Sequence, residues 1–256
     1  MQDLYADWAE VYDYFHPDRG IEVAFWARRA RRHGWRVLDL MCGTAEVSLG
    51  LARQGLSVLG VDRSLAMLTV GSRRLAAAAD FPARNLTLAQ GDACDLPVSD
   101  NHFDFAWVGG NGSFNHLGDE QAGPALCELG RVLRPGGGLG LELVNPHLLS
   151  EIEPQRIFGP LRHPSAGTRL KRCVQTRYDP AAGMIHIDQK TFHLDEDGCS
   201  EFEESLCLYV QKPEDIATKL RAAGFCNLAF YGGYDLEPFG KWSPDLLVLA
   251  TRQEAK

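Results

Sequence analysis

The fold is decided by the stretch Val37-Leu-Asp-Leu-Met-Cys-Gly-Thr-Ala-Glu-Val47. Its first part belongs to an apolar run over residues 36–40, which predicts a buried strand with Asp39 near its end. A turn of small residues follows, and the pattern over 45–54 predicts a helix that ends at Gly55. This order leaves backbone N–H groups and a positive helix end at the carboxyl edge of a sheet, where open α/β sheets bind ligands. The stretch therefore predicts a ligand site at that edge.

The same alternation of short apolar strands and amphipathic helices continues along the first half of the chain. Further strands are predicted over residues 57–61, 86–90, 103–108 and 139–144, and further helices over 64–79 and 119–133. Short apolar strands that alternate with helices are typical of a parallel sheet covered on both faces. We therefore expect an α/β fold with a Rossmann-like, doubly wound sheet.

The pattern changes after Asn145. Three long strands are predicted over 168–178, 184–194 and 199–210, with imperfect alternation, and they form an inserted antiparallel β-meander. A helix over 213–223 and strands over 228–231 and 246–251 then complete the sheet. We expect one domain in four parts: an N-terminal helical lid (1–34), a cofactor-binding core (35–145), the inserted antiparallel strands (146–210) and the C-terminal completion of the sheet (211–256).

Composition narrows the classes of function. The 256 residues contain 26 Lys and Arg against 34 Asp and Glu, a formal charge of −8, which disfavours nucleic acid and anionic membranes as partners. The densest basic cluster, formed by Arg28, Arg29, Arg31 and Arg32, is interpreted as a solvated helix face. The seven Cys include no C-x-x-C pair and fit a reducing cytoplasm, and neither a signal peptide nor a membrane span is predicted.

The acidic residue Asp62 ends the next predicted strand, 19 residues after Gly43, where a carboxylate can bind the ribose hydroxyls of an adenosine ligand. NAD needs G-x-G-x-x-G, but the chain has Gly43, Ala45 and Ser48 in this register. Asp39 is also a poor neighbour for a pyrophosphate. It suits the sulfonium and ammonium groups of S-adenosylmethionine, acting through the turn backbone and water. A βα turn without any ligand is the third interpretation.

Three further motifs follow in order: Gln90-Gly-Asp-Ala93, with Asp92 placed to accept from an adenine amino group, Asn101-His-Phe-Asp-Phe105, and Leu133-Arg-Pro-Gly-Gly137. With these motifs, residues 5–145 and 206–252 resemble a class I S-adenosylmethionine-dependent methyltransferase. The resemblance implies a seven-stranded sheet whose last strand is antiparallel, with S-adenosylmethionine as cofactor and S-adenosylhomocysteine as product. Ala45 departs from the family, which usually has glycine there.

The expected cofactor-binding residues lie at the strand ends and in the N-terminal segment, which folds over the cofactor as a lid in the family. They are Tyr5, Tyr12, Asp39, Cys42, Gly43, Asp62, Arg63, Gly91, Asp92, Ala93 and Gly109. The N-terminal segment is aromatic, with Tyr5, Trp8, Tyr12, Tyr14 and Phe15, and its rings can face a sulfonium or orient an acceptor. A buried helix face is the alternative for each of them.

The acceptor side is expected after the fourth strand, in Gly109-Gly-Asn-Gly-Ser-Phe-Asn-His-Leu117. Its second part is similar to the Asn-Ser-Phe-x-His-Leu element of glycine N-methyltransferase-like enzymes, with Gly112 inserted, and amino-sugar N-methyltransferases have a comparable Ser-x-x-His-Leu. His116 is the candidate base or orienting group, or else fixes the loop by hydrogen bonding. The expected catalytic residues are His116, Tyr14 and Asn111, and the expected substrate-binding residues are Asn145 and Ser113.

The meander is the other expected specificity element, above the site or at the interface of a homodimer. His186 and Asp188 alternate onto one strand face, but a third metal ligand is not evident, so no metal is expected. Arg156, Arg162 and His163 are expected in a loop near the pocket, where they would suit an acceptor carboxylate.

The leading function is therefore transfer of a methyl group from S-adenosylmethionine to a small molecule, with an amine nitrogen as the favoured acceptor. In-line displacement needs positioning in a dry site more than an explicit base. An NAD-dependent oxidoreductase and a catalytically silent S-adenosylmethionine-binding protein remain the alternatives.

Overall fold

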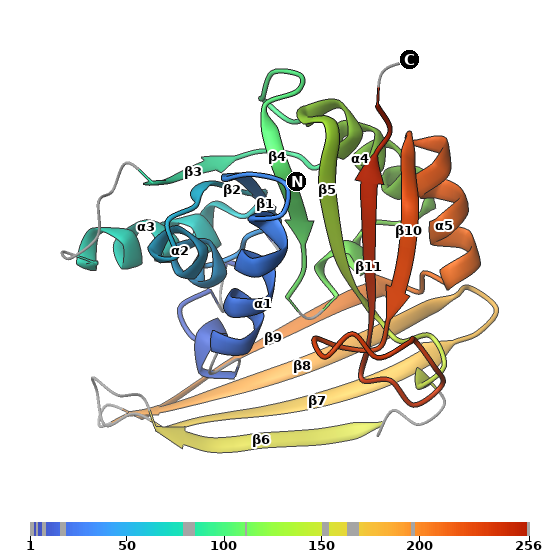
Figure 1. Cartoon of the computed structure of the whole chain (residues 1–256). Helices are drawn as coiled ribbons and strands as arrows, with labels where there is room; N and C mark the ends of the chain where they lie inside the picture. Colours follow the sequence, from blue (N-terminus) through green and yellow to red (C-terminus); the bar gives the residue numbers. More distant parts are fainter. Residues whose placement is uncertain are drawn as a thin grey trace.

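The computed structural model describes residues 3, 5–6, 9–15, 19–78, 85–110, 112–149, 154–162, 169–195 and 198–254. Its centre is a seven-stranded sheet in the order β10-β11-β5-β4-β1-β2-β3. Only β11 runs antiparallel, both to β5 and to β10. A separate four-stranded antiparallel sheet, in the order β6-β7-β8-β9, lies across the carboxyl edge of the first (Figure 1). The α/β fold and the antiparallel last strand are thus confirmed.

The elements follow the sequence pattern closely. The central strands are β1 (Arg36–Leu40), β2 (Ser57–Asp62), β3 (Leu86–Gln90), β4 (Phe103–Val108), β5 (Leu133–Val144), β10 (Phe225–Tyr231) and β11 (Asp245–Arg252). The helices are α1 (Gly20–Ala30), α2 (Glu46–Arg53), α3 (Leu65–Ala77), α4 (Asp119–Val132) and α5 (Pro213–Ala222), with 3-10 helices η1 (Tyr12–Phe15) and η3 (Ser113–His116). The second sheet contains β6 (Gln155–Arg162), β7 (Arg169–Asp179), β8 (Met184–Asp195) and β9 (Gly198–Tyr209).

Helices cover both faces of the central sheet. On one face, α4 and α5 bury Leu126 and Ile216 against the apolar residues of β1, β4, β5 and β11. On the other face, α1 and α2 pack with Trp26 and Trp107 in a second cluster. A Cβ at Gly140 would lie 2.2 Å from the Trp26 ring, so only glycine lets α1 approach β5 this closely. Most of α1 is therefore a core layer. Before it, the described residues Asp3 and Asp13 reach the carboxyl edge through Ser64 and Thr44.

One strand of the second sheet differs from the sequence prediction. Residues 154–162, expected as a loop containing Arg156 and Arg162, include β6, which pairs with β7. The pairing shifts between Phe158 and Leu161, around Gly159 and Pro160, and Gly159 has φ 108°. A Gly-Pro pair is typical of a turn, but an edge strand tolerates proline because one side needs no ladder hydrogen bonds. The loop prediction was wrong for this reason.

The start of β5 also differs from the prediction. The strand was expected to begin at Leu139, after a glycine-rich turn, but it begins at Leu133, and its pairing with β4 shifts between Phe103 and Phe105. The extra residues accommodate the shift in pairing and keep Gly138 beside Phe105.

None of the helices in the described part of the chain has the length and apolar character needed to span a membrane.

Candidate active site

The turn between β1 and α2 is built from left-handed backbone. Met41, Gly43 and Ala45 have φ values of 63°, 55° and 58°. The N–H groups of Met41 and Cys42 both donate to the Val61 carbonyl at the end of β2, at 2.7 and 3.1 Å. Ala45 occupies a conformation that favours glycine, which accounts for the family preference and adds strain to this turn. The expected turn is therefore present, with Ala45 held at the N-terminus of α2.

Asp62 connects the ends of two strands to this turn. Its carboxylate accepts hydrogen bonds from the Gly43 N–H at 2.7 Å and the Ser64 N–H at 2.8 Å. Burial raises the pKa of Asp62, and the hydrogen bonds from backbone N–H groups oppose that shift. Because a carboxylate has about four acceptor positions and the Arg63 backbone also donates to this one, room remains for at least one hydroxyl donor.

Asp39 lies beneath the same turn and is almost fully buried. Ser48 Oγ in α2 donates to its Oδ2 at 2.5 Å. Burial raises the pKa of Asp39 to about 7, the Ser48 hydrogen bond opposes this shift, and the charges of Glu22 and Asp62 add to it. A cation brought near Asp39 would therefore lower this pKa and favour the charged carboxylate.

A small cavity of about 40 Å³ opens beside this turn. Six expected site residues line it: Tyr12, Asp39, Cys42, Gly43, Gly109 and Ser113. Sequence reasoning missed the charged lining residues Asp13, Arg19 and Glu46. With Asp39 they make three carboxylates and one guanidinium, so the cavity is acidic. Thr44, Val47 and Trp107 also belong to its wall.

The N-terminal segment closes over this cavity through contacts with distant elements. Asp3 accepts from Ser64 Oγ at 2.9 Å, and the Tyr5 hydroxyl lies 2.9 Å from His116 Nε2. Asp13 accepts from Thr44 Oγ1 at 2.7 Å and pairs with Arg74 of α3. The segment thus joins η3, the β1–α2 turn and the start of α3.

His116 is half-buried and lies beside Tyr5. Burial lowers the pKa of His116 to about 4, so the imidazole is neutral near pH 7. Burial also raises the pKa of Tyr5, and the nearby charges of Glu204 and Asp62 add to that shift. A neutral phenol and a neutral imidazole at this distance share one hydrogen bond, and the His116 tautomer sets which of them donates. The His116 loop is therefore fixed by this bond in the closed segment.

Other expected site residues have structural contacts. The Asn145 amide donates to the Ser243 carbonyl at 2.7 Å and accepts from the His147 N–H at 2.8 Å. Tyr14 packs with Phe15 and Leu170 and does not line the cavity. Ser113 Oγ donates to the Gly109 carbonyl at 2.8 Å and so shapes the cavity wall.

Four expected cofactor positions, Arg63, Gly91, Asp92 and Ala93, surround the ends of β2 and β3. The Gly91 N–H donates to the Asp62 carbonyl at 3.0 Å, and Ala93 is buried. Arg63 and Asp92 are exposed, and Asp92 accepts from the Cys94 N–H at 2.9 Å. These residues line the strand edge outside the small cavity. Trp8, Asn111 and His163 lie outside the described residues, as does the side chain of Arg162.

The inner face of the second sheet contributes polar groups that sequence reasoning missed. Arg172, Gln189 and Thr191 are buried there. Gln189 Nε2 donates to Glu204 Oε2 at 2.5 Å, and the Arg172 guanidinium lies 4.3 Å from the Phe15 ring centre. Burial lowers the pKa of Arg172 to about 10. The only sequence signal was the imperfect alternation, which arises because inward positions of these strands are polar.

His186 and Asp188, at which no metal was expected, contact side chains of the neighbouring strand. His186 Nδ1 lies 3.3 Å from Cys207 Sγ, and Asp188 accepts from Ser205 Oγ at 2.5 Å, both across β8 and β9. Among the described residues, no group of three or more His, Cys, Asp or Glu is placed to hold a metal ion.

Comparisons with known proteins agree with this geometry. Residues 37–137 match the family described as "Methyltransferase domain". A demethylmenaquinone methyltransferase of Corynebacterium kroppenstedtii is 35% identical over 125 residues, which cover 47% of this chain and 48% of that protein. The chain spans about half the length of the curated relatives it matches.

Two solved structures resemble the whole chain. An S-adenosylmethionine-dependent methyltransferase from Clostridium acetobutylicum has a TM-score of 0.80 at 18% identity, covering 97% of this chain and 99% of that one. An amino pentose methyltransferase from Micromonospora echinaspora, with S-adenosylmethionine bound, has a TM-score of 0.72 at 24% identity, covering 99% and 100%. The chain therefore contains a methyltransferase domain with the class I fold of S-adenosylmethionine-dependent methyltransferases.

A buried carboxylate beside the site gives a testable pH dependence. Burial raises the pKa of Glu142 to about 7, the charge of Glu22 adds to the shift, and the Tyr234 hydroxyl donates to Glu142 at 2.5 Å. The folded state therefore binds a proton that the unfolded state has lost, so stability falls as pH rises from about 4.5 to 7.

We expect Glu142→Gln to raise the melting temperature at pH 8 and leave it nearly unchanged at pH 5, because Gln removes the cost of ionising a buried acid. Calorimetry at both pH values measures this. Glu237→Gln, at an exposed loop position, is the matched control and should change neither value. A Glu142→Gln protein that is less stable at pH 8 than the unaltered chain would contradict the assignment.

Proposed function

We propose that the chain is an S-adenosylmethionine-dependent methyltransferase that acts on a small molecule, with an amine nitrogen as the favoured acceptor. The observation that carries the proposal is the acidic cavity at the carboxyl edge of the sheet, where Asp13, Asp39 and Glu46 outnumber Arg19. Such a lining attracts a cationic ligand and repels a dianionic pyrophosphate. It therefore favours a sulfonium cofactor over NAD.

Named residues fit the parts of such a ligand. Asp62 has acceptor capacity left for a ribose hydroxyl, and Asp92 is exposed at the end of β3 to accept from an adenine amino group. Asp39 provides negative charge beneath the turn, and Tyr12 and Trp107 provide ring faces for a sulfonium. When bound, S-adenosylmethionine supplies an electrophilic methyl group that an acceptor displaces in line.

The N-terminal segment must move for this ligand to enter. A cavity of about 40 Å³ is far smaller than the ~300 Å³ or more of typical ligand sites. Its covering residues, Tyr12 and Asp13, belong to the segment that Asp3 and Tyr5 attach to α3 and η3. Closure of this segment then excludes water from the reacting atoms, which strengthens every electrostatic contact inside.

The acceptor side combines neutral and acidic groups. Neutral His116 can accept a hydrogen bond from an amine N–H, and Tyr5 can orient the same group. Glu204 lies close enough for its charge to raise the pKa of Tyr5, and it provides a counter-charge for an amine-bearing acceptor. A sugar N-methyltransferase from Streptoalloteichus that shares this fold is consistent with a nitrogen acceptor.

Cofactor binding tests the first part of the proposal. We expect S-adenosylmethionine and S-adenosylhomocysteine to bind in a calorimetric titration and NAD not to bind. Asp62→Asn should weaken S-adenosylmethionine binding at least about tenfold, because charge-assisted hydrogen bonds are lost. Asp100→Asn, beside Arg131 at the amino end of β4, is the control and should bind normally. Stabilisation by NAD alone would falsify the proposal.

Turnover tests the acceptor side. We expect His116→Ala to lower the rate of methyl transfer roughly a hundredfold or more if the imidazole takes the proton, with unchanged affinity for S-adenosylmethionine. Tyr5→Phe should raise KM for the acceptor, because it removes an orienting hydroxyl. The assay offers labelled methyl groups to amino sugars, α-amino acids and phenols. His102→Ala, on an exposed imidazole, is the control. Full turnover by His116→Ala with a methylated amine would reduce His116 to a structural residue.

The proposal includes self-association through the inserted strands. The edge strand β6 presents Ile157, whose side chain is 58% exposed. We expect sedimentation equilibrium to give a dimer and Ile157→Lys to give a monomer, because a charge on an edge strand opposes pairing. Ile21→Lys, at a 71% exposed position of α1, is the matched control. A monomer at all concentrations of the unaltered chain would remove this part of the proposal.

A further inference from the structure

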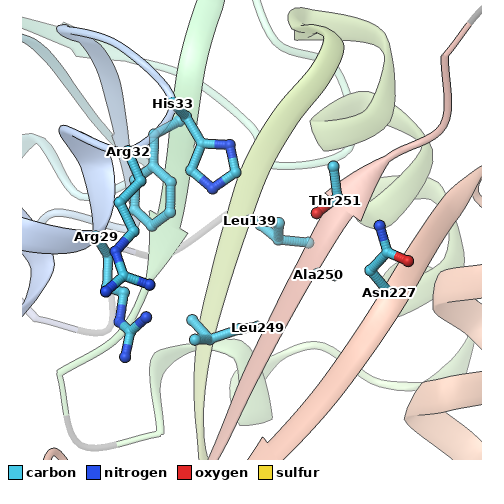
Figure 2. A pocket seen from close by; sticks show the side chains of 9 residues that line it. Arg29, Arg32, His33, Leu139, Asn227, Leu249, Ala250 and Thr251 are labelled. Atoms are coloured by element: carbon cyan, nitrogen blue, oxygen red, sulfur yellow. The ribbon is translucent and has the colours of Figure 1, made fainter.

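A second cavity lies away from the cofactor edge, between the end of α1 and the strands β4, β5, β10 and β11. It measures about 100 Å³ and is partly open to solvent. Its polar lining is Arg29, Arg32, His33, Asn227 and Thr251, and Phe105, Leu139, Leu249 and Ala250 form the apolar wall. Figure 2 shows the arginines on one side of the cavity and Asn227 and Thr251 on the other. The position is near the amino ends of the parallel strands.

The charged groups of this cavity are all basic. Of the described residues that line it, none is a carboxylate, although the whole chain has an excess of eight acidic groups. Arg31, which caps the end of α1 next to Arg32, donates to the Gln54 side chain and carbonyl outside the cavity. The bias toward positive charge is therefore local, and it is opposite to the bias of the cofactor cavity.

The burial of Arg29 contradicts the prediction that the basic cluster of Arg28, Arg29, Arg31 and Arg32 is a solvated helix face. Its side chain is 9% exposed, and its Nε is buried without a hydrogen-bond partner among the described residues. The guanidinium lies 5.2 Å from the Phe25 ring centre, a contact that orients it but provides no acceptor. Burial lowers the pKa of Arg29, and the charges of Arg32 and Arg28 act in the same direction.

A helix end does not account for this arrangement. The negative end of a helix favours cations in the last turn, but an exposed arginine gains that energy without losing its hydration. A buried guanidinium with an unmet N–H costs free energy unless an acceptor meets it. An anion between Arg29 and Arg32 would satisfy that group and separate the like charges.

Neutral donors face the same space. Asn227 lies where the pairing of β10 with β11 shifts between Cys226 and Ala229, and it has φ 52°. An irregularity of this kind redirects a side chain out of the regular strand pattern. The Thr251 hydroxyl and the His33 ring, whose Nδ1 lies 3.2 Å from the Gly136 carbonyl, complete the lining.

We propose that this cavity is an anion-binding site that takes a phosphate group between Arg29, Arg32 and the Asn227–Thr251 side. The volume has room for several water molecules, enough for a phosphate group but too little for a whole nucleotide. The tetrahedral oxygens match the planar fork of guanidinium donors, and hydroxyl and amide donors meet the remaining oxygens. The occupant is free phosphate or the phosphate of a small ester.

The test uses the full chain and compares sodium phosphate with sodium chloride at equal ionic strength. We expect phosphate to raise the melting temperature progressively with concentration, because a ligand that binds the folded state stabilises it. Calorimetric titration with inorganic phosphate and with glycerol 3-phosphate distinguishes the two sources. Tighter binding of the ester identifies a phosphorylated metabolite, and tighter binding of phosphate identifies the free ion.

Two variants locate the effect. Arg32→Gln, at an exposed position that tolerates substitution, should weaken phosphate binding about tenfold by removing a charged donor. Arg29→Met should abolish the phosphate effect and raise the melting temperature in chloride, because an unpaired buried cation is gone. Arg28→Gln, on the same helix but outside the lining, is the matched control and should bind normally. Equal stabilisation by phosphate and chloride, or an Arg32→Gln protein that binds phosphate as well as the unaltered chain, overturns the proposal.

Discussion

The interaction on which the site depends is the hydrogen bond between the Asp62 carboxylate and the Gly43 N–H. The β1–α2 turn contains left-handed residues, among them Ala45. A left-handed backbone is strained for alanine and persists only where surrounding contacts stabilise it. Asp62 holds the middle of that turn, while the Val61 carbonyl holds its start. The same carboxylate accepts from the Ser64 N–H before α3. One side chain therefore fixes the ends of β1 and β2 relative to the starts of α2 and α3.

Charge is divided between the two ends of the sheet in a way that net charge does not reveal. The carboxyl edge has an acidic cavity with Asp39 at its base, and the other cavity is lined by Arg29 and Arg32. The helix α1 connects the two cavities. Arg19, just before its first residue, lines the first cavity, and Arg29, in its last turn, lines the second. The packing of Trp26 against β5 fixes this helix and thereby both cavities.

The sequence was sufficient for the central sheet because its strands and helices obey local patterns. It also placed Asp39, Gly43 and Asp62 correctly at one edge, since parallel strands end together. It failed at β6, where Gly159 and Pro160 look locally like a turn and only an edge position permits a strand. It also could not find contacts such as those of Asp13, because they depend on where a distant segment packs.

The contact between Tyr5 and His116 links closure of the N-terminal segment to the chemistry of the site. In the closed segment the Tyr5 hydroxyl occupies His116 Nε2, the nitrogen nearest the segment. An amine acceptor of the proposed kind would have to replace Tyr5 at this nitrogen or bind the hydroxyl in its place. Because burial keeps His116 neutral, either arrangement leaves an acceptor for an N–H and no competing positive charge. Glu204, which accepts from Gln189 on the polar inner face of the second sheet, lies near enough for its charge to raise the pKa of Tyr5.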